Sequence, residues 1–229
     1  MLSLKILGLT DLHTSGKIPL EDLQKIINDE GIDLVILAGD LTTYGSSELV
    51  KEALVEFNRI EKPVYYIPGN MDAENSGDHE FSNIHPLHIR VINYSGYNFI
   101  GLGGSNPTPF RTPFTIQEEQ IATLLQQLKS KIKTKDPIIL VCHTPPFESE
   151  ADKIHSGKHV GSSSVKEFIE KENPVVILCG HIHESKSIST INQTLCINPG
   201  AARHRNGAVI NLRKDKEGKV KATGKLIIF

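Results

Sequence analysis

Seven side chains of the types that bind metal ions or transfer protons follow closely on apolar segments of this chain. They are Asp11, His13, Asp40, Asn70, His143, His181 and His183. Carboxylate, carboxamide and imidazole groups without thiolates suit Mn²⁺, Fe, Zn²⁺ or Co²⁺ better than an all-oxygen Ca²⁺ site would. Two such ions about 3.5–4 Å apart would share a carboxylate and a bridging hydroxide, which attacks phosphate esters at neutral pH. The set therefore indicates a dinuclear metal site with hydrolytic chemistry.

Two pairs of these side chains repeat the same spacing. Asp11 and His13 are two residues apart, and so are His181 and His183. Side chains at i and i+2 leave the same face of an extended segment, so both members of a pair can reach one cation. Each residue alone is more commonly a surface acid or a satisfied core histidine, and only their joint occurrence favours a metal site.

The elements that must position these side chains are five short apolar segments. They are LKILGLT, DLVILAG, VYYIPG, PIILVC and PVVILCG. Segments rich in Val, Ile and Leu predict buried parallel strands, and functional groups gather beyond the carboxyl ends of such strands. We therefore expect the seven side chains to meet at one edge of one sheet. Glycines at positions 39, 69 and 180 are expected to allow tight turns and a close approach of the backbone to a bound ion.

Helices are predicted between the strands. The first runs from about Pro19 to Glu30, and the second follows the N-cap candidate Ser46. Thr115 and Glu118 form a predicted capping box before an amphipathic helix. The last helix is expected to begin near Ser164.

Beyond residue 183 the pattern changes to β-rich segments separated by turn signals. SKSISTI, QTLCIN, GAVINLR and KVKATGKLIIF are predicted to form an antiparallel sheet that completes the same domain. Repeats and linkers that would indicate a second domain are lacking, so residues 1–229 are expected to form a single domain. The predicted α/β architecture is two sheets packed face to face with helices outside.

Composition and charge argue against several functional classes. The 229 residues are 38% apolar, and 25 Lys and Arg residues against 27 Asp and Glu residues give a net charge of −2. This balance indicates neither a broad basic surface for nucleic acid nor a polybasic membrane anchor. The apolar segments have strand length and the N-terminus lacks signal-peptide features, so a cytoplasmic protein without membrane spans is expected. Cys142, Cys179 and Cys196 lie in apolar segments and are expected to be buried, reduced thiols.

In these residues the chain resembles the calcineurin-like metallophosphoesterase family. The pattern of that family runs D-x-H, G-D, G-N-H-[DE], a lone H and G-H-x-H, and here it reads DLH, GD, GNMD, CH and GHIH. The strings HTPPF, GKHVGS, LCGHIHES and NPGAARHR are also similar to those of small cytosolic prokaryotic members, which are predicted phosphoesterases. The resemblance spans Asp11 to His183 and implies a four-layer αββα sandwich, two mixed β-sheets flanked by helices, with two bound metal ions.

The resemblance also implies which residues hold the two ions. One would be held by Asp11, His13, Asp40 and His183, and the other by Asp40, Asn70, His143 and His181. Asp40 would bridge them. Mn²⁺ is expected first, with Fe, Zn²⁺, Ni²⁺ or Co²⁺ as alternatives. The implied activity is that of a phosphoric ester hydrolase, foremost a phosphodiesterase, acting on a small phosphate ester.

One motif departs from the family pattern, at Met71. The histidine of the family at this position donates to the phosphate or protonates the leaving group, and a thioether cannot donate a proton. We therefore expect hydrolysis of phosphodiesters with good leaving groups and weaker action on alkyl monoesters. His159, in the loop after the His143 segment, could bind phosphate or donate a proton instead, or could be a solvated loop residue. The candidate catalytic residues are Asp40, Asn70, His143 and His159.

Other functions are compatible with parts of the sequence. A phosphomonoesterase or nucleotide phosphatase would use the same metal site. A non-catalytic interaction scaffold fits the loss at Met71, but it has no physical need for seven converging metal-binding side chains. A nuclease is disfavoured by the charge balance and the absence of Trp. A homo-oligomer is compatible with the sequence, and Arg203 is expected in a solvated turn rather than in contact with substrate.

Overall fold

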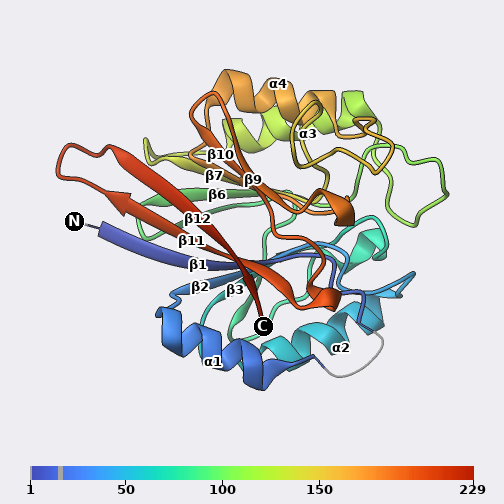
Figure 1. Ribbon diagram of the computed structural model, residues 1–229, viewed down its shortest axis with the longest axis horizontal. Coiled ribbons are helices and arrows are strands. Elements are labelled where there is room, and N and C mark those ends of the chain that lie inside the picture. The colour runs from blue at the N-terminus through green and yellow to red at the C-terminus, as the bar shows by residue number, and fades with distance from the viewer. Residues whose placement is uncertain (1, 15–17) are drawn as a thin grey trace.

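Two mixed β-sheets packed face to face, with helices on both outer faces, form the framework of the protein (Figure 1). The structure is a computed structural model that describes residues 2–14 and 18–229, and within these residues each sheet has six strands. Helices α1 (Leu20–Glu30) and α2 (Ser47–Phe57) cover one sheet. Helices α3 (Glu118–Ser130) and α4 (Ser163–Glu172) cover the other. The predicted four-layer αββα sandwich is confirmed.

The first sheet has the strand order β12-β11-β1-β2-β3-β4. Its strands are β1 (Leu2–Leu9), β2 (Leu34–Ala38), β3 (Val64–Ile67), β4 (Ile84–Pro86), β11 (Asn206–Lys214) and β12 (Val220–Ile228). The strands from β1 to β4 are parallel neighbours, whereas β11 runs antiparallel to both β1 and β12.

The second sheet has the strand order β5-β6-β7-β8-β10-β9. Its strands are β5 (Val91–Tyr94), β6 (Tyr97–Leu102), β7 (Ile138–Cys142), β8 (Val176–Leu178), β9 (Ser187–Ile191) and β10 (Thr194–Asn198). The strands β6, β7, β8 and β10 are parallel neighbours, with β5 and β9 antiparallel at the two edges. Short 3₁₀ turns follow β3, β8 and β10 as η1 (Glu74–Ser76), η2 (His183–Ser185) and η3 (Ala202–His204).

Apolar side chains fill the three spaces between the four layers. Leu23 and Phe57 pack between the helices and the first sheet, Ile6 and Phe99 between the two sheets, and Leu125 between the second sheet and α3. Burying such a side chain contributes about 1.5–3 kcal/mol, so this core holds the strand ends in fixed positions. None of the helices in the described part of the chain has both the length and the apolar character needed to cross a membrane.

The prediction that the five ligand-bearing strands share one sheet is wrong. Strands β1, β2 and β3 lie in the first sheet, whereas β7 and β8 lie in the second. The two sheets are stacked so that the carboxyl ends of these strands adjoin: His143 contacts Asp40 and Asn70, and His183 contacts Asp11. Apolar runs identify buried strands, but they do not say which of two stacked sheets a strand joins.

The four β segments after residue 183 are also divided between the sheets, which corrects the prediction of one antiparallel sheet. Strands β9 and β10 extend the second sheet, with β10 parallel to β8, and β11 and β12 extend the first. Strand β11 pairs with β1 from Leu2 opposite Lys214 to Gly8 opposite Ala208. Strand β11 is second from the edge of the first sheet, and the residues from Gly207 to Ile210 are buried on both of its faces.

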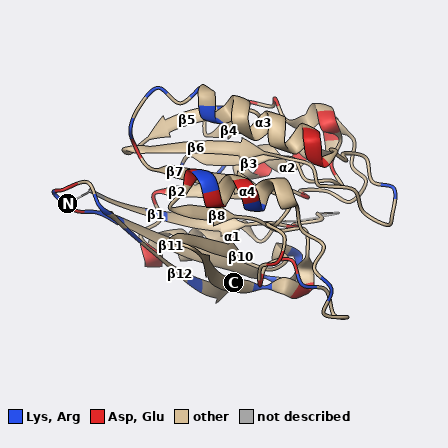
Figure 2. Cartoon of the chain, turned by 90° about the horizontal axis from the view of Figure 1, so that it is seen from above, with Lys and Arg blue, Asp and Glu red and all other residues tan. Residues whose placement is uncertain are grey.

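Charged side chains of both signs are interspersed on the surface (Figure 2). On α4, the basic residues Lys166 and Lys171 lie among the acidic residues Glu167, Glu170 and Glu172. The edge strand β12 exposes Lys225, and lysine on an edge strand discourages pairing with another sheet.

The predicted capping box at Thr115 and Glu118 is wrong. Helix α3 begins one residue after Gln117, whose backbone N–H donates to Gln120 Oε1 at 3.2 Å. Glu118 instead turns toward the start of α4, where its Oε2 accepts from Ser162 Oγ at 2.8 Å and from the N–H of Ser164 at 3.1 Å. A carboxylate at a helix N-terminus satisfies free N–H groups and complements the helix dipole. Glu118 thus joins two helices rather than capping its own.

Replacing Glu118 by Ala is expected to lower the free energy of unfolding by about 1 kcal/mol, because α4 loses this carboxylate. Chemical denaturation monitored by circular dichroism measures the change. Glu119→Ala is the matched control, since it removes the same charge from the same turn of α3 without a contact to α4. Equal destabilisation by both substitutions would contradict the conclusion that the carboxylate of Glu118 stabilises the N-terminus of α4.

Candidate metal centre

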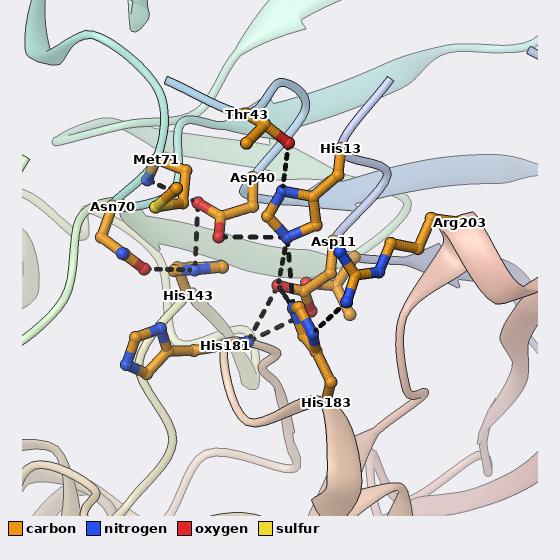
Figure 3. Close-up of polar contacts among 12 residues, drawn as sticks. Asp11, His13, Asp40, Thr43, Asn70, Met71, His143, His181, His183 and Arg203 are labelled. Carbon is orange, nitrogen blue, oxygen red and sulfur yellow. Dashed lines mark hydrogen bonds and ion pairs between the residues drawn. The ribbon is translucent and has the colours of Figure 1, made fainter. Parts of the chain in front are cut away.

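The loops that follow β1, β2, β3, β7 and β8 converge at one end of the sandwich (Figure 3). Backbone hydrogen bonds join the loops to one another. The N–H of Asp11 donates to the carbonyl of Gly39 at 3.0 Å, and the N–H of Gly180 donates to the carbonyl of His143 at 3.0 Å. The ends of strands from both sheets are therefore fixed relative to one another.

Four of the seven predicted ligands have left-handed backbone conformations. Asp11, His13, Asp40 and His181 have φ values of 54°, 43°, 49° and 70°. This region costs a residue other than glycine roughly 1 kcal/mol or more, and such strain concentrates at functional sites. The turn after the strand is thus made by the ligand residue itself, which keeps its side chain at the junction of the two sheets.

Glycines beside the predicted ligands are required by close contacts. A β-carbon on Gly39 would lie 2.4 Å from His143 Nδ1, and one on Gly69 would lie 2.0 Å from Asp40 Oδ1. Gly180 is restricted in the same way. The contacts are with ligands of neighbouring loops, so the close approach to an ion expected from the sequence is not needed to explain these glycines.

Asp11, His13 and His183 form the first group of side chains that can hold a metal ion. Their ligand atoms lie within 4.8 Å of one another. His183 Nε2 is 3.2 Å from Asp11 Oδ1 and 3.2 Å from His13 Nε2. Thr43 Oγ1 lies 3.0 Å from His13 Nδ1 and fixes the orientation of that ring (Figure 3). Two imidazole nitrogens and a carboxylate oxygen therefore face one position.

Asp11, Asp40 and His143 form the second such group. His143 is fully buried, and its Nδ1 is 2.8 Å from the carbonyl oxygen of Ala38. A carbonyl only accepts, so Nδ1 carries the hydrogen and the lone pair of Nε2 can bind a cation. Asn70 Oδ1 and Asp40 Oδ1 lie 3.1 Å and 3.4 Å from Nε2. Several acceptors thus surround one point, which is the environment that a cation needs.

Asp40 spans the two groups. Its Oδ1 faces His143 Nε2 at 3.4 Å, and its Oδ2 faces His13 Nε2 at 3.6 Å. Asp11 is also shared by both groups. Two carboxylates that are no more than 2% exposed therefore lie among the imidazoles. Buried charges of this kind require opposite charge nearby.

The pKa values of the buried groups reflect this requirement. Burial raises the pKa of Asp11, but the hydrogen bond from His183 and the charges of the imidazoles bring it well below its usual range. Burial lowers the pKa of His143, but the charges of Asp40 and Asp11 and the hydrogen bonds to Asp40 and to the carbonyl of Ala38 together outweigh burial and raise the pKa to about 9. The carboxylates thus stabilise positive charge at this point, either as a proton on His143 or as a metal ion. The donor set fits divalent ions.

His181 lies beside the two groups rather than within either of them. Its backbone N–H donates to Asp11 Oδ2 at 3.1 Å. Its ring packs edge to face against His143, with the centroids 5.4 Å apart (Figure 3). Burial and the charge of His143 lower the pKa of His181 to about 4. The ring is therefore neutral near pH 7, which is the form that ligates metals.

Met71 and Asp72 contribute to the site in ways that the sequence motif does not suggest. The backbone N–H of Met71 donates to Asp40 Oδ1 at 2.8 Å. The buried carboxylate of Asp72 accepts from the N–H groups of Leu41 at 3.0 Å and Gly69 at 2.8 Å. Asp72, left without an imidazole partner in the motif, thereby joins the loop after β2 to the loop after β3.

His159 lies in the loop between β7 and α4, outside the two groups of side chains. Its Nδ1 is 2.6 Å from Asp152 Oδ1. Asp152 is buried, and its carboxylate also accepts from the N–H groups of Ser149 at 2.9 Å and Gly161 at 2.9 Å. The position of this carboxylate is therefore fixed, and it orients the imidazole with Nδ1–H as the donor. The side chain of His159 is 29% exposed.

The side chains of three residues outside the predicted set also contact the ligands: those of Thr10, Thr43 and Arg203. Thr10 Oγ1 donates to Asp11 Oδ2 at 2.9 Å. Arg203, expected in a solvated turn, lies with Nη2 3.1 Å from His183 Nδ1 (Figure 3). Thr10 and Thr43 are close in the sequence to Asp11 and Asp40, and this closeness could have indicated that they contact the site. Arg203 follows the last ligand by twenty residues, and no local pattern connects it to the site.

Comparison with known proteins agrees with this geometry. The family described as Calcineurin-like phosphoesterase matches residues 4–185. An uncharacterized protein of Methanocaldococcus jannaschii is 38% identical over 200 residues, covering 86% of this chain and 88% of that protein. A protein of Arcobacter nitrofigilis named as a probable glycerophosphodiester phosphodiesterase is 27% identical over 190 residues, covering 80% of this chain and 67% of that protein.

The fold is also found in a solved structure of a dimetal phosphatase from Danio rerio. The two structures superpose with a TM-score of 0.60 at 12% sequence identity, and the match covers 98% of each chain. At this identity the agreement concerns the fold alone.

Gly69→Ala is expected to abolish metal binding and to lower the free energy of unfolding by about 1–3 kcal/mol, because the added methyl group collides with Asp40. The collision involves the backbone nitrogen of Asp40 at 2.1 Å as well as its side chain, so it cannot be relieved by a rotamer change. Calorimetric titration with Mn²⁺ and thermal unfolding measure the two effects. Gly31→Ala is the control: its left-handed backbone (φ 65°) should cost about 1 kcal/mol of stability, but nothing lies within 4 Å of its added carbon, so metal binding should be unchanged. Metal binding by the Gly69 variant with the affinity of the natural protein would contradict this account.

Proposed function

The chain belongs to the calcineurin-like phosphoesterase family, and on that basis we propose that it is a dinuclear metal-dependent phosphodiesterase. The observation that carries the proposal is the placement of Asp40, whose two oxygens face His13 and His143 on different sides. A carboxylate oriented in this way can serve as the shared ligand of two ions. The named activity of the Arcobacter relative supports a diester as the substrate rather than a monoester.

We assign the two ions to overlapping sets of ligands. One ion is bound by Asp11, His13, Asp40 and His183, and the other by Asp40, Asn70, His143 and His181. Nitrogen and oxygen ligands without sulfur favour Mn²⁺ as our first choice, with Fe, Zn²⁺, Ni²⁺ or Co²⁺ as alternatives. The buried, cation-stabilising surroundings of His143 support this assignment.

The chemistry divides between the ions and the protein. When bound, such ions lower the pKa of a water molecule toward neutrality and offset the negative charge of the phosphate ester. The protein holds its ligands in the tautomer and orientation that this requires. The carbonyl of Ala38 keeps the hydrogen of His143 on Nδ1, and Thr43 holds the ring of His13 in place. Outer contacts of this kind typically change metal affinity or activity by about 10- to 100-fold.

We propose His159 as the donor of a proton to the leaving group. Met71 cannot donate a proton, and Asp72 is engaged by backbone N–H groups. His159 and Asp152 form a separate imidazole–carboxylate pair in which Asp152 holds Nδ1–H. This leaves Nε2 of His159 to carry and release a proton toward a departing alkoxide.

Removal of metal with a chelator is expected to abolish hydrolysis, and adding Mn²⁺, Ni²⁺, Zn²⁺ or Mg²⁺ back should restore it to different extents. Aryl diester, aryl monoester and cyclic nucleotide substrates test the substrate class, with the diester expected to be hydrolysed fastest. Asp40→Asn should lower kcat/KM by roughly 100-fold or more, since even outer contacts matter by 10- to 100-fold. Asp29→Asn, on the exposed face of α1, is the control. Full activity after complete metal removal would refute the proposal.

His159→Ala is expected to slow the hydrolysis of diesters with poor leaving groups by roughly 100-fold, within the range typical of general acid catalysis. Diesters with good leaving groups should be affected much less, because their alkoxides depart without protonation. The measurement is kcat/KM for a series of aryl and alkyl diesters of graded leaving-group pKa. His155→Ala, in the same loop and exposed, is the control. A uniform loss across the series would mean that His159 does not protonate the leaving group.

A further inference from the structure

The backbone of Arg203 is anchored to the loop that carries Asp11. Turn η3 follows β10 and hydrogen-bonds to this loop, because the N–H of Ala202 donates to the carbonyl of Thr10 at 2.8 Å. The N–H of Arg203 donates to the carbonyl of Asp11 at 3.2 Å. The side chain of Arg203 therefore begins beside a metal-ligand candidate. It is also exposed, so it can reach both the cluster and an arriving substrate (Figure 3).

Two imidazole nitrogens hold the guanidinium group of Arg203. Its Nη2 is 3.1 Å from His183 Nδ1, and its Nε is 3.2 Å from His204 Nε2. An arginine can only donate hydrogen bonds, so both imidazole nitrogens accept. In this arrangement the hydrogen of a neutral His183 is on Nε2, which faces Asp11 Oδ1 at 3.2 Å.

A metal ion bound by His183 is incompatible with this contact. An ion held by His183 together with Asp11 and His13 would take the lone pair of Nε2, the nitrogen that faces those two side chains, and the hydrogen of the ring would then be on Nδ1. Nδ1–H and the guanidinium N–H then face each other as two donors, which cannot form a hydrogen bond. The guanidinium has to turn away from His183, and its exposed position allows this movement. The released N–H groups are then free to donate to another acceptor, and a phosphate group at the metal centre is one.

We propose that Arg203 is a substrate-binding residue. Its guanidinium leaves His183 when metal is bound and then donates hydrogen bonds to the non-bridging oxygens of the phosphate ester. The inference rests on the proposed function, since it requires both the metal ions and a phosphate ligand. The planar guanidinium presents parallel N–H groups that match two oxygens of one phosphate, which the single ammonium group of lysine cannot do. Arg203 therefore recognises the phosphate itself rather than the alcohol that is released.

Inorganic phosphate binding to the metal-loaded protein tests the proposal without relying on turnover. The protein is loaded with two equivalents of Mn²⁺, freed of excess metal and titrated with phosphate in a calorimeter. Arg203→Ala is expected to weaken phosphate binding by roughly 10- to 100-fold, the effect of losing hydrogen bonds from a charged group. Arg203→Lys should fall between this variant and the natural protein. Arg213→Ala removes the same charge from an exposed position on β11 and should leave phosphate affinity unchanged.

Mn²⁺ affinity, measured separately, distinguishes substrate binding from a purely structural role. Because Arg203 competes with the metal-binding form of His183, Arg203→Ala should bind Mn²⁺ as tightly as the natural protein or more tightly. The proposal would be overturned if Arg203→Ala bound Mn²⁺ more weakly and bound phosphate normally once both metal sites were filled. Arg203 would then only orient His183.

The remaining outcomes also decide the question. Unchanged phosphate affinity in Arg203→Ala overturns the proposal while leaving the phosphoesterase assignment intact, provided that the natural protein binds two ions and phosphate. A natural protein that binds no Mn²⁺, Ni²⁺, Zn²⁺ or Mg²⁺ overturns both. If Arg203→Ala does not fold, Arg203→Lys replaces it. A phosphate affinity of Arg203→Lys equal to that of the natural protein would then contradict the bidentate contact between the guanidinium and the phosphate.

Discussion

The burial of two carboxylates at the junction of two sheets is the constraint from which the rest of the candidate centre follows. Asp11 and Asp40 are excluded from water, and an uncompensated charge in such a position is costly. The surrounding imidazoles share this charge, and the raised pKa of His143 reflects the resulting demand for a cation. Positive charge, either a proton on His143 or a bound metal ion, therefore stabilises a site built in this way.

Bringing these groups together requires unfavourable backbone conformations at the ends of the strands. Asp11 and Asp40 adopt left-handed conformations immediately after their strands, and glycines on adjacent loops leave room for the side chains. Hydrogen bonds of Asp72 and of the backbone N–H of Met71 then fix the loop after β2 relative to the loop after β3. The αββα core supplies the rigidity that these strained turns need, since both sheets are fixed by buried apolar side chains.

With Met71 in place of the family's histidine, all seven ligand candidates are still present and only one proton donor is lost. Two other groups reach the surface of the protein: His159, held by Asp152, and Arg203, held by His183. One is suited to proton transfer and the other to anion binding, because imidazole can change its protonation state and guanidinium cannot. Together they offer functions that the Met71–Asp72 pair cannot provide.

The chain of 229 residues by itself determined the five ligand-bearing strands and the seven ligand candidates, because apolar runs followed by polar residues are local patterns. The αββα arrangement followed from the order of the predicted elements and from the family resemblance. Tertiary structure alone decided that β7 and β8 lie in a different sheet from β1, and that the segments after residue 183 are divided between the two sheets. It also decided that Glu118 serves α4 rather than α3, and that Arg203 contacts His183. Such choices depend on packing and hydrogen bonds between residues far apart in the chain, whose free energies no local pattern encodes.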